Sequence, residues 1–392
     1  MNDNKTGNYY QSSSFILKIA RYIVILGLIV FLICCILIYR NDITIENIQF
    51  LTKYITLNDG SSHYYDEEFQ VNTTSSSNIF MLRDNVAIVD KTGIALYELS
   101  GSKLFNYSYS YSSPATVCDL HNILIHDIEG NELSIFNSFS RVYSQKYNYG
   151  VRCADINEKG FAIITGEKGY RSALIAYNDN YNEYFRWLSE DNYLSALSLS
   201  PNGRNIAVST VKTDNGSYKC SVKIFDTTKD EPIHTTDDFD ELPLYLSYSQ
   251  NGKNIYVITD SSIKFYTSTL DEITSHKFNQ SKIKDYYTSN DMIIFSELNN
   301  LSGNSTKLTG FNCEGDRLFE ININDDISDV AIGKTELYAL GIDGVYKYSA
   351  NQDGKYEMSA LVPISKRYNS ILCDSEDNCY ITSDSSVIRV EF

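Results

Sequence analysis

The sequence predicts an all-β domain, a β-propeller of eight four-stranded blades, preceded by one transmembrane α-helix. Three observations support this prediction. Short apolar strands alternate with polar turns throughout residues 61–392. A group of three such strands recurs about every 42 residues, which is the period of propeller blades. An uncharged apolar run of membrane-spanning length occupies residues 22–39.

The repeat is clearest in LSALSLSPNGRNIAVST and LPLYLSYSQNGKNIYVITD, which are each followed by a strand ending in an aromatic residue. The SPNG and SQNG turns favour hairpins, because Asn and Gly tolerate positive φ. Helical repeats of similar period are disfavoured, since the apolar runs are short, β-branched and aromatic. The third strand of each copy ends at or near Tyr97, Phe136, Tyr177, Phe225, Tyr266, Phe311, Tyr348 and Val390.

The last copy of the repeat stops after its third strand, at the C-terminal Phe392. We expect Tyr64–Val71 to supply its fourth strand and so close the ring without leaving a long open sheet edge. A ring of seven blades, with one copy miscounted, is the alternative.

The SPNGRNIAV and VKIFD segments resemble WD40-like and quinoprotein-like propellers. The whole chain resembles uncharacterised single-pass membrane-anchored propeller proteins of clostridial-type bacteria. The repeat covers about residues 64–392, and the resemblance implies a fold without implying a chemistry. The A-x-D-x-x-T-G-x motifs and blade-end tryptophans of pyrroloquinoline-quinone enzymes are missing from the sequence, which has one Trp. We therefore expect no cofactor.

The apolar run YIVILGLIVFLICCILIY would span about 27 Å as a helix, close to the bilayer core of about 30 Å. Tyr22 and Tyr39 stand at its two ends, where aromatic rings favour the headgroup layer. A cleaved signal peptide, or a lipoprotein cysteine at Cys34 or Cys35, is the alternative. The predicted organisation is a cytoplasmic tail (1–18), a transmembrane helix (19–40), a juxtamembrane linker (41–60) and the propeller (61–392).

The charges around this run predict its orientation. Lys5, Lys18 and Arg21 precede the helix, whereas Arg40 is soon followed by acidic residues. Positive flanks stay in the cytoplasm, so we expect a plasma-membrane protein with its propeller outside. The net charge of −17 makes nucleic acid a poor partner, because like charges repel.

Cys118, His121 and His126 form the densest group of potential metal ligands, in the pattern C-D-L-H-x4-H-D. This spacing matches no strong zinc motif, so ordinary turn and core residues are the alternative. Cys373 and Cys379 flank a predicted turn, DSEDN, and either pair as a disulfide or remain free thiols. That turn lacks the ligand pattern of a calcium loop.

Tyrosine is abundant, with 32 residues, and several tyrosines cluster near the outer strands of three successive blades. Such rings either form an aromatic surface for a protein or sugar partner, or pack between the blades. In YSYSY, a period of two places alternate residues on one face. The candidate surface residues are Tyr107, Tyr109, Tyr111, Tyr143, Tyr147, Tyr149, Tyr181, Tyr184 and Trp187.

The sequence contains no G-x-S-x-G elbow, and its five histidines do not recur at one position of the repeat. We therefore expect a membrane-anchored, extracytoplasmic, non-enzymatic scaffold that binds a protein partner in the cell envelope. A glycan-binding or cell-wall-binding module is the alternative. A hydrolase or metal-dependent sensor centred on residues 118–127 is the third interpretation.

Overall fold

The computed structural model describes residues 21–31, 68–71, 77–214, 216–278, 283–289, 291–299, 305–351 and 355–392. The chain divides into two units, Met1–Ser61 and Ser62–Phe392. In the first unit, residues 21–31 form an α-helix whose apolar side chains are exposed. Within the described ranges, no helix is both long enough and apolar enough to span a bilayer. The rest of the predicted span, and residues 41–60, lie outside the described residues.

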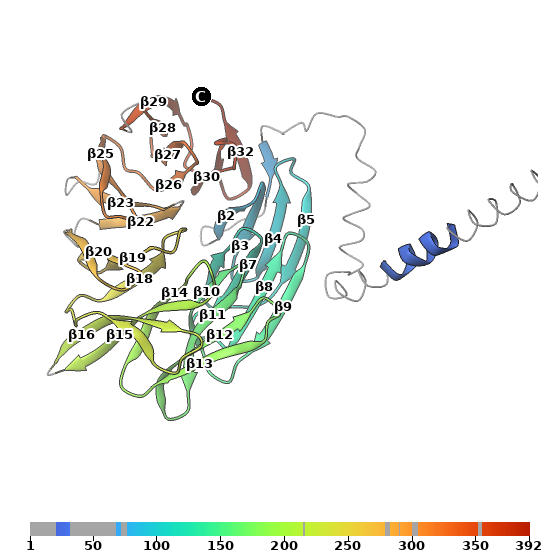
Figure 1. Cartoon of the computed structure of the whole chain (residues 1–392). Coiled ribbons are helices and arrows are strands. Elements are labelled where there is room, and N and C mark those ends of the chain that lie inside the picture. Colours follow the sequence, from blue (N-terminus) through green and yellow to red (C-terminus); the bar gives the residue numbers. More distant parts are fainter. Residues whose placement is uncertain are drawn as a thin grey trace, which may run out of the picture. The chain divides into compact units, whose positions relative to one another are not determined.

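The second unit consists of eight four-stranded antiparallel sheets, which are the blades of a β-propeller (Figure 1). The all-β prediction and the count of eight blades are confirmed, and the seven-bladed alternative is wrong. In blades 1 to 7 the chain runs from the innermost strand to the outermost in sequence order. Blade 8 combines the last three strands with the first.

Blade 1 contains β2 (Asn78–Leu82), β3 (Asn85–Val89), β4 (Gly93–Glu98) and β5 (Lys103–Ser108). Blade 2 contains β6 (Pro114–Cys118), β7 (Asn122–Asp127), β8 (Glu132–Asn137) and β9 (Arg141–Lys146). Blade 3 contains β10 (Val151–Asn157), β11 (Gly160–Glu167), β12 (Tyr170–Asn178) and β13 (Glu183–Ser189). Blade 4 contains β14 (Tyr193–Leu199), β15 (Asn205–Asp214), β16 (Ser217–Asp226) and β17 (Pro232–Thr235).

Blade 5 contains β18 (Pro243–Tyr248), β19 (Asn254–Thr259), β20 (Ser262–Thr267) and β21 (Glu272–Lys277). Blade 6 contains β22 (Ile283–Ser289), β23 (Met292–Leu298), β24 (Thr306–Asn312) and β25 (Arg317–Ile323). Blade 7 contains β26 (Asp329–Ile332), β27 (Glu336–Leu340), β28 (Gly344–Ala350) and β29 (Tyr356–Pro363). Blade 8 contains β30 (Ser370–Cys373), β31 (Cys379–Thr382), β32 (Ser386–Val390) and β1 (Glu68–Gln70).

Closure of the ring depends on the pairing of β1 with β32, which lie side by side in Figure 1. The register places Phe69 opposite Val387, and both side chains are buried in one apolar core. Gly101, in the turn between β4 and β5, packs on this site: a Cβ there would lie 2.7 Å from the Phe69 Cβ. The expected fourth strand of the last blade is thus confirmed for residues 68–70, and residues 64–67 lie outside the described ranges.

The blades pack face to face, and each apolar core forms between two neighbours. One core joins Leu124 and Leu133 of blade 2 to Ile163 and Ile175 of blade 3. Second and third strands are buried on both faces, which explains why they read in the sequence as continuous apolar runs. Outermost strands are more exposed: in β9, Val142 and Tyr143 are half-buried and the other residues are exposed.

The aromatic residue that ends the third strand marks a change of register in each of blades 1 to 7. The pairing between third and fourth strands shifts at this residue, for example between Ile135 and Phe136. An extra residue in one strand increases the local twist, which suits the strongly twisted blades of a propeller. The same register shift occurs at Tyr97, Tyr177, Phe225, Tyr266, Phe311 and Tyr348.

Two faces of the ring follow from this topology. The top face carries the turns between second and third strands and the connections from one blade to the next. The bottom face carries the remaining turns, and there hydrogen bonds join neighbouring blades. Asp377 of blade 8 accepts from the backbone N–H groups of Lys334 and Thr335 of blade 7, at 2.5 and 3.0 Å. Ser375 of blade 8 donates to Asp84 of blade 1 at 2.8 Å.

We predict that Phe69→Ala lowers the free energy of unfolding by about 3 kcal/mol, because it leaves a cavity at the closure site. Phe69 is 6% exposed. Urea unfolding of the full chain measures the change. Glu68→Ala, on the exposed side of the same strand, is the matched control and is expected to have little effect. Equal losses in the two variants would contradict the role assigned to Phe69.

Candidate functional site

The three predicted metal ligands do not come together. Cys118 and His121 are exposed on the bottom face, whereas His126 is the last but one residue of β7, at the top face. His121 Nδ1 lies 2.6 Å from Arg83 Nη2, and its Nε2 lies 4.0 Å from the Glu158 carboxylate. Along an extended strand, the five residue steps from His121 to His126 span about 16 Å. Among the described residues, no group of three His, Cys, Asp or Glu side chains is placed to hold a metal ion.

His126 is instead a core residue between blades 2 and 3. Its side chain is 2% exposed, and neither ring nitrogen makes a hydrogen bond of ordinary geometry to a described residue. It shares a face of β7 with Leu124, which packs against blade 3. Burial lowers the pKa of His126 to about 4, although the backbone at Arg152 and the Asp127 carboxylate oppose this shift. The ring is therefore held neutral.

Cys373 and Cys379 face each other across the β30–β31 hairpin, but both are free thiols. Of the two alternatives that the sequence left open, the structure has the free thiols. The Cys373 thiol turns towards the main-chain oxygen of Asp374, at 3.5 Å, and the Asp377 carboxylate, at 3.9 Å. In the turn between them, Asp374 accepts from the backbone N–H groups of Glu376 and Asn378, so this carboxylate stabilises the hairpin.

Most of the predicted aromatic surface is packed between the blades. Tyr107, Tyr109 and Tyr111 contact the core between blades 1 and 2, where Tyr109 and Tyr111 stack at 4.2 Å. Tyr143, Tyr147 and Tyr181 pack against the core between blades 2 and 3. Trp187 packs on Phe225 between blades 3 and 4, with ring centroids 4.8 Å apart.

Tyr149 and Tyr184 are the exposed members of the predicted set, at 39% and 40%. They do not share a surface. Tyr149 lies in the connection to blade 3 on the top face, whereas the Tyr184 hydroxyl donates to Gly203 O on the bottom face at 3.1 Å. The sequence pattern of alternating tyrosines therefore identified inter-blade packing more often than exposed surface.

Sequence reasoning missed a group of exposed tyrosines on the top face. Tyr170, Tyr193 and Tyr218 are all exposed, and each stands at or beside the start of a strand, next to a turn or connection. A signal existed: Tyr170 and Tyr218 follow the glycines of the EKGY and NGSY turns. A residue beside a hairpin turn lies at the rim of a blade, beyond the reach of the inter-blade core.

Tyr193 lies at the centre of a site that we call the Tyr193 patch, formed by Glu129, Arg152, Arg171 and Tyr193; Tyr149 is exposed on the same face of the ring. Arg171 Nη1 donates to the Tyr193 hydroxyl at 2.9 Å. The guanidinium carbons of Arg171 and Arg152 lie 5.3 and 5.8 Å from the centroid of the Tyr193 ring, within range of a cation–π interaction. All five residues lie at the top ends of strands, or in top-face turns, of blades 2 to 4.

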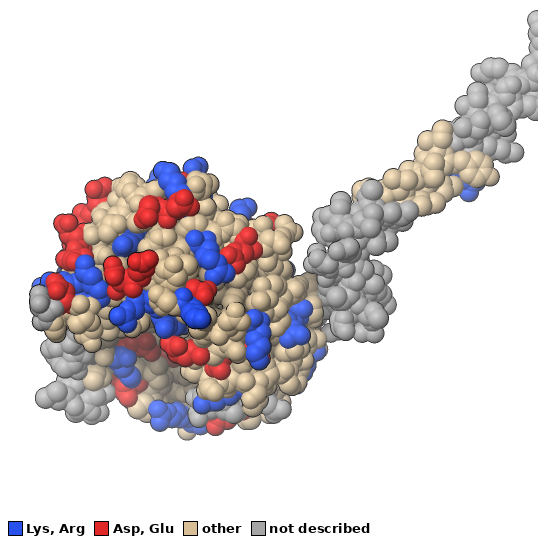
Figure 2. Space-filling model, turned by 90° about the horizontal axis from the view of Figure 1, so that it is seen from below, with Lys and Arg blue, Asp and Glu red and all other residues tan. Residues whose placement is uncertain are grey.

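The two arginines of the patch differ in their partners. Arg152 pairs with the Glu129 carboxylate at 3.2 Å and donates to Ser172 Oγ and Arg171 O, each at 3.2 Å. For Arg171, no carboxylate of the described part of the chain lies within ion-pair distance. The positive charge of Arg171 is thus available to a ligand. In the view of Figure 2, basic and acidic side chains are interspersed over the surface of the propeller.

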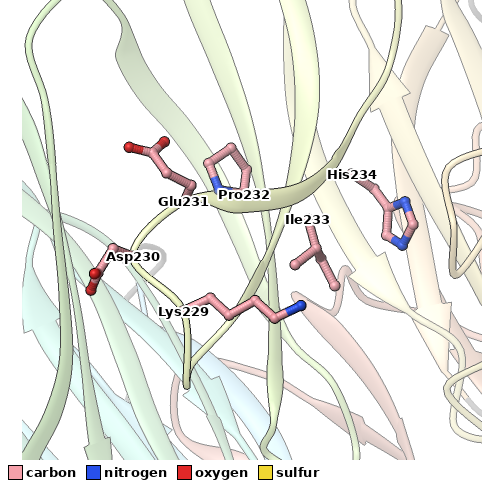
Figure 3. A pocket seen from close by; sticks show the side chains of 6 residues that line it. All are labelled: Lys229, Asp230, Glu231, Pro232, Ile233 and His234. Atoms are coloured by element: carbon pink, nitrogen blue, oxygen red, sulfur yellow. The ribbon is translucent and has the colours of Figure 1, made fainter.

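Two hollows in the surface were weaker candidates. One is lined by six consecutive residues, Lys229–His234, and in Figure 3 Asp230 and Glu231 point away from His234, so these groups do not converge. The other, of about 370 Å³, lies between blades 5 and 6, with Phe278, Phe295 and Phe311 along its walls. It adjoins residues 279–282, which are outside the described ranges.

We predict that His126 makes the propeller less stable in mild acid. Its folded pKa, about 4, lies below the ordinary value of 6.5, so the stabilisation present above pH 6.5 is lost as the pH falls towards 4. Between pH 7 and pH 5 this loss is about 2 kcal/mol.

Urea unfolding at the two pH values, in the wild type and in His126→Leu, isolates this contribution. Asp155 and Asp329 titrate in the opposite sense, because burial raises the pKa of each to about 6. The difference between the variant and the wild type cancels their effect. An unchanged pH dependence in His126→Leu would contradict the assignment.

Comparison with known proteins supports the fold. The crystal structure of the computationally designed Ika8 protein is similar, with a TM-score of 0.59, 10% identity, and coverage of 82% of this chain and 99% of that chain. The C-terminal WD40 domain of Sif2 gives a TM-score of 0.56, 11% identity, and coverage of 83% and 99%. No sequence among the curated proteins is similar to this chain. Residues 58–392 match the model of a family of unknown function, DUF5711, and the chain therefore belongs to this family.

Proposed function

We propose that this protein is a membrane-anchored, extracytoplasmic scaffold, without enzymatic activity, that binds a protein partner through the Tyr193 patch. The observation that supports the proposal is the exposed contact between Arg171 and Tyr193 on the top face of the ring, where Tyr149 is exposed too. Tyrosine and arginine are enriched at protein interfaces, where they supply much of the binding energy.

The closed ring gives this patch a rigid support. Arg152 is fixed by three contacts, to Glu129, Ser172 and the backbone at Arg171. Tyr149 packs over Gly166 of β11, where an added Cβ would lie 3.1 Å from the Tyr149 Cβ. A surface whose side chains are already held in place loses less conformational entropy when a partner binds.

Anchoring by residues 19–40 is supported by the uncharged run at residues 22–39. Its described part, residues 21–31, is helical, and apolar side chains such as Ile23, Leu26 and Phe31 are exposed along it. Apolar side chains around the whole circumference are favourable in a hydrocarbon environment. The basic residues before the run support a cytoplasmic tail at 1–18.

We expect a photo-crosslinker at Tyr193 to capture a protein partner in intact cells. In the experiment, p-benzoylphenylalanine replaces Tyr193 in the full chain, and adducts are identified by mass spectrometry. Replacement of Tyr184 is the matched control, because this tyrosine is 40% exposed, against 46% for Tyr193, but lies on the bottom face.

A specific protein adduct at Tyr193 and none at Tyr184 is the expected outcome. Protein adducts of equal yield at both positions, or at Tyr184 alone, would contradict the proposal that the partner binds at the Tyr193 patch. Co-sedimentation of the full chain with cell-wall polysaccharide that Tyr193→Ala abolishes, in the absence of protein adducts, would establish glycan binding instead.

We also predict that Leu26→Arg combined with Ile29→Arg moves the full chain from the carbonate-resistant membrane fraction to the soluble fraction. A charge at the centre of a spanning helix costs about 3 kcal/mol. The control is Leu120→Arg, on an exposed bottom-face turn of the propeller, which should leave the fractionation unchanged. A tag placed after Phe392 should be cleaved by protease added to intact protoplasts; a protected tag would reverse the proposed orientation.

A further inference from the structure

We infer that Cys373 and Cys379 form a redox-active pair, which a small disulfide compound oxidises to a cross-strand disulfide that stiffens the turn joining blade 8 to its two neighbours. The structure has the reduced form, with two free thiols. This inference goes beyond the proposed function and does not depend on which partner the top face binds. The placement of the two cysteines in the β30–β31 hairpin supports it.

The side chains of the two cysteines lie on the same face of blade 8. Cys373 and Cys379 are direct partners in the register of β30 and β31. Both contribute to the apolar core between blades 7 and 8, where Cys379 is 1% exposed and Cys373 is half-buried. Directly opposite residues on one face of an antiparallel pair are the nearest side-chain neighbours across the strands.

The pair also occupies the kind of position at which antiparallel strands come closest. Asp374 N donates to Asn378 O at 3.1 Å, so the next pair towards the turn is hydrogen-bonded. Hydrogen-bonded and non-hydrogen-bonded pairs alternate, which makes Cys373 and Cys379 a non-hydrogen-bonded pair with Cα atoms about 4.5 Å apart. Ile371 agrees with this assignment, because its N–H donates to a carboxylate of blade 7 at 2.9 Å and not to β31. A disulfide spans Cα separations of roughly 4.4–6.8 Å, so the backbone already fits the bond.

In the reduced form, the thiol of Cys373 is directed towards the turn. Its Sγ atom lies 3.5 Å from Asp374 O and 3.9 Å from the Asp377 carboxylate. A thiol is a weak donor, so rotation of this side chain to another staggered position, towards Cys379, loses little. Since Cys373 is half-buried and Cys379 is buried, a small reagent meets Cys373 first.

The oxidation is a thiol–disulfide exchange in two steps. The Cys373 thiol loses its proton, and its sulfur attacks one sulfur of the small disulfide and releases the other half as a thiol. The Cys379 thiol then loses its proton, and its sulfur attacks Cys373 Sγ in the mixed disulfide and releases the second half. The protein gives up two electrons and two protons, and the small disulfide is reduced to two thiols.

The environment of Cys373 makes the uncatalysed reaction slow. Burial, together with the carboxylates of Asp377 and Asp374, raises the pKa of Cys373 to about 12. The thiolate is the attacking species, and little of it is present at neutral pH. The incubation with the oxidant therefore has to be long.

The turn between the two cysteines holds blade 8 to both of its neighbours. The Asp377 carboxylate accepts from Thr335 Oγ1 of blade 7 at 2.6 Å, and Asp377 O accepts from the Tyr338 hydroxyl at 2.6 Å. Ser375 donates to Asp84 of blade 1 at 2.8 Å. A disulfide at the base of this turn reduces the conformational freedom of the unfolded chain. Oxidation should therefore stabilise the blade that β1 completes.

Peptide mapping of the full chain tests this inference. The protein in detergent is incubated with oxidised glutathione or with dithiothreitol, and free thiols are alkylated with iodoacetamide in urea before digestion with trypsin. Trypsin cuts after Arg367 and Arg389, so one peptide, residues 368–389, contains both cysteines and no others. After oxidation, this peptide should carry no alkyl group and weigh two hydrogen atoms less than its reduced form. After dithiothreitol, it should carry two alkyl groups.

Two variants separate this pair from the other cysteines. Cys373→Ser removes the half-buried member of the pair. Cys118→Ser is the matched control, because Cys118 also ends the innermost strand of its blade, but its cross-strand partner is Ile123. The urea midpoints of the reduced proteins establish that all are folded.

Oxidation should raise the urea midpoint of the wild type and of Cys118→Ser, and leave that of Cys373→Ser unchanged. For a loop of this length, the equilibrium constant for unfolding should fall about fiftyfold.

Two alkyl groups on the peptide after oxidation, or a glutathione adduct on Cys373 without the disulfide, would overturn the inference. A disulfide that leaves the midpoint unchanged or lowers it would contradict the stabilising role. An equal rise in Cys373→Ser would assign the effect to other cysteines, with the same consequence. The crosslinking experiment at Tyr193 reports on the proposed function separately, because it does not involve these thiols.

Discussion

The pairing of β1 with β32 is the contact on which the rest of the propeller depends. Each blade buries its apolar faces against two neighbours, so an open ring would expose two such faces and a sheet edge. Phe69 and Val387 close this gap with strands that lie more than 300 residues apart in the chain. The closure is non-local. The conformational entropy lost when the two distant segments are brought together is offset only once the last blade packs against its neighbours.

Closure also explains how the protein uses its aromatic residues. Residues such as Phe136 and Tyr177 lie where the third strand changes register with the fourth, and their rings are buried in or beside the cores between blades. Large rings fill the space that opens between two twisted sheets towards the outside of the ring. Many of the tyrosines that suggested a binding surface therefore stabilise the blade interfaces.

The Tyr193 patch is a property of the ring rim and not of one blade. Arg171 comes from blade 3 and Tyr193 from blade 4, while Glu129 comes from blade 2 and compensates Arg152. Neighbouring blades are fixed relative to one another by their cores, so the patch is organised before a partner arrives. This arrangement suits a scaffold, because its binding surface does not have to rearrange when a partner binds.

The sequence alone determined the repeat of short strands and predicted the strand that closes the ring, because strand alternation and a constant period are local signals that add along the chain. It favoured eight blades over seven, and the structure decided between the two counts. It did not determine which face of a strand meets the next blade, and so could not separate buried Tyr111 from exposed Tyr149. Nor did it show that His121, in the turn before β7, and His126, near the far end of that strand, lie at opposite faces of the ring. Only the tertiary structure showed the contact between Arg171 and Tyr193. It joins two blades, and no local sequence pattern predicts how two blades pack against each other.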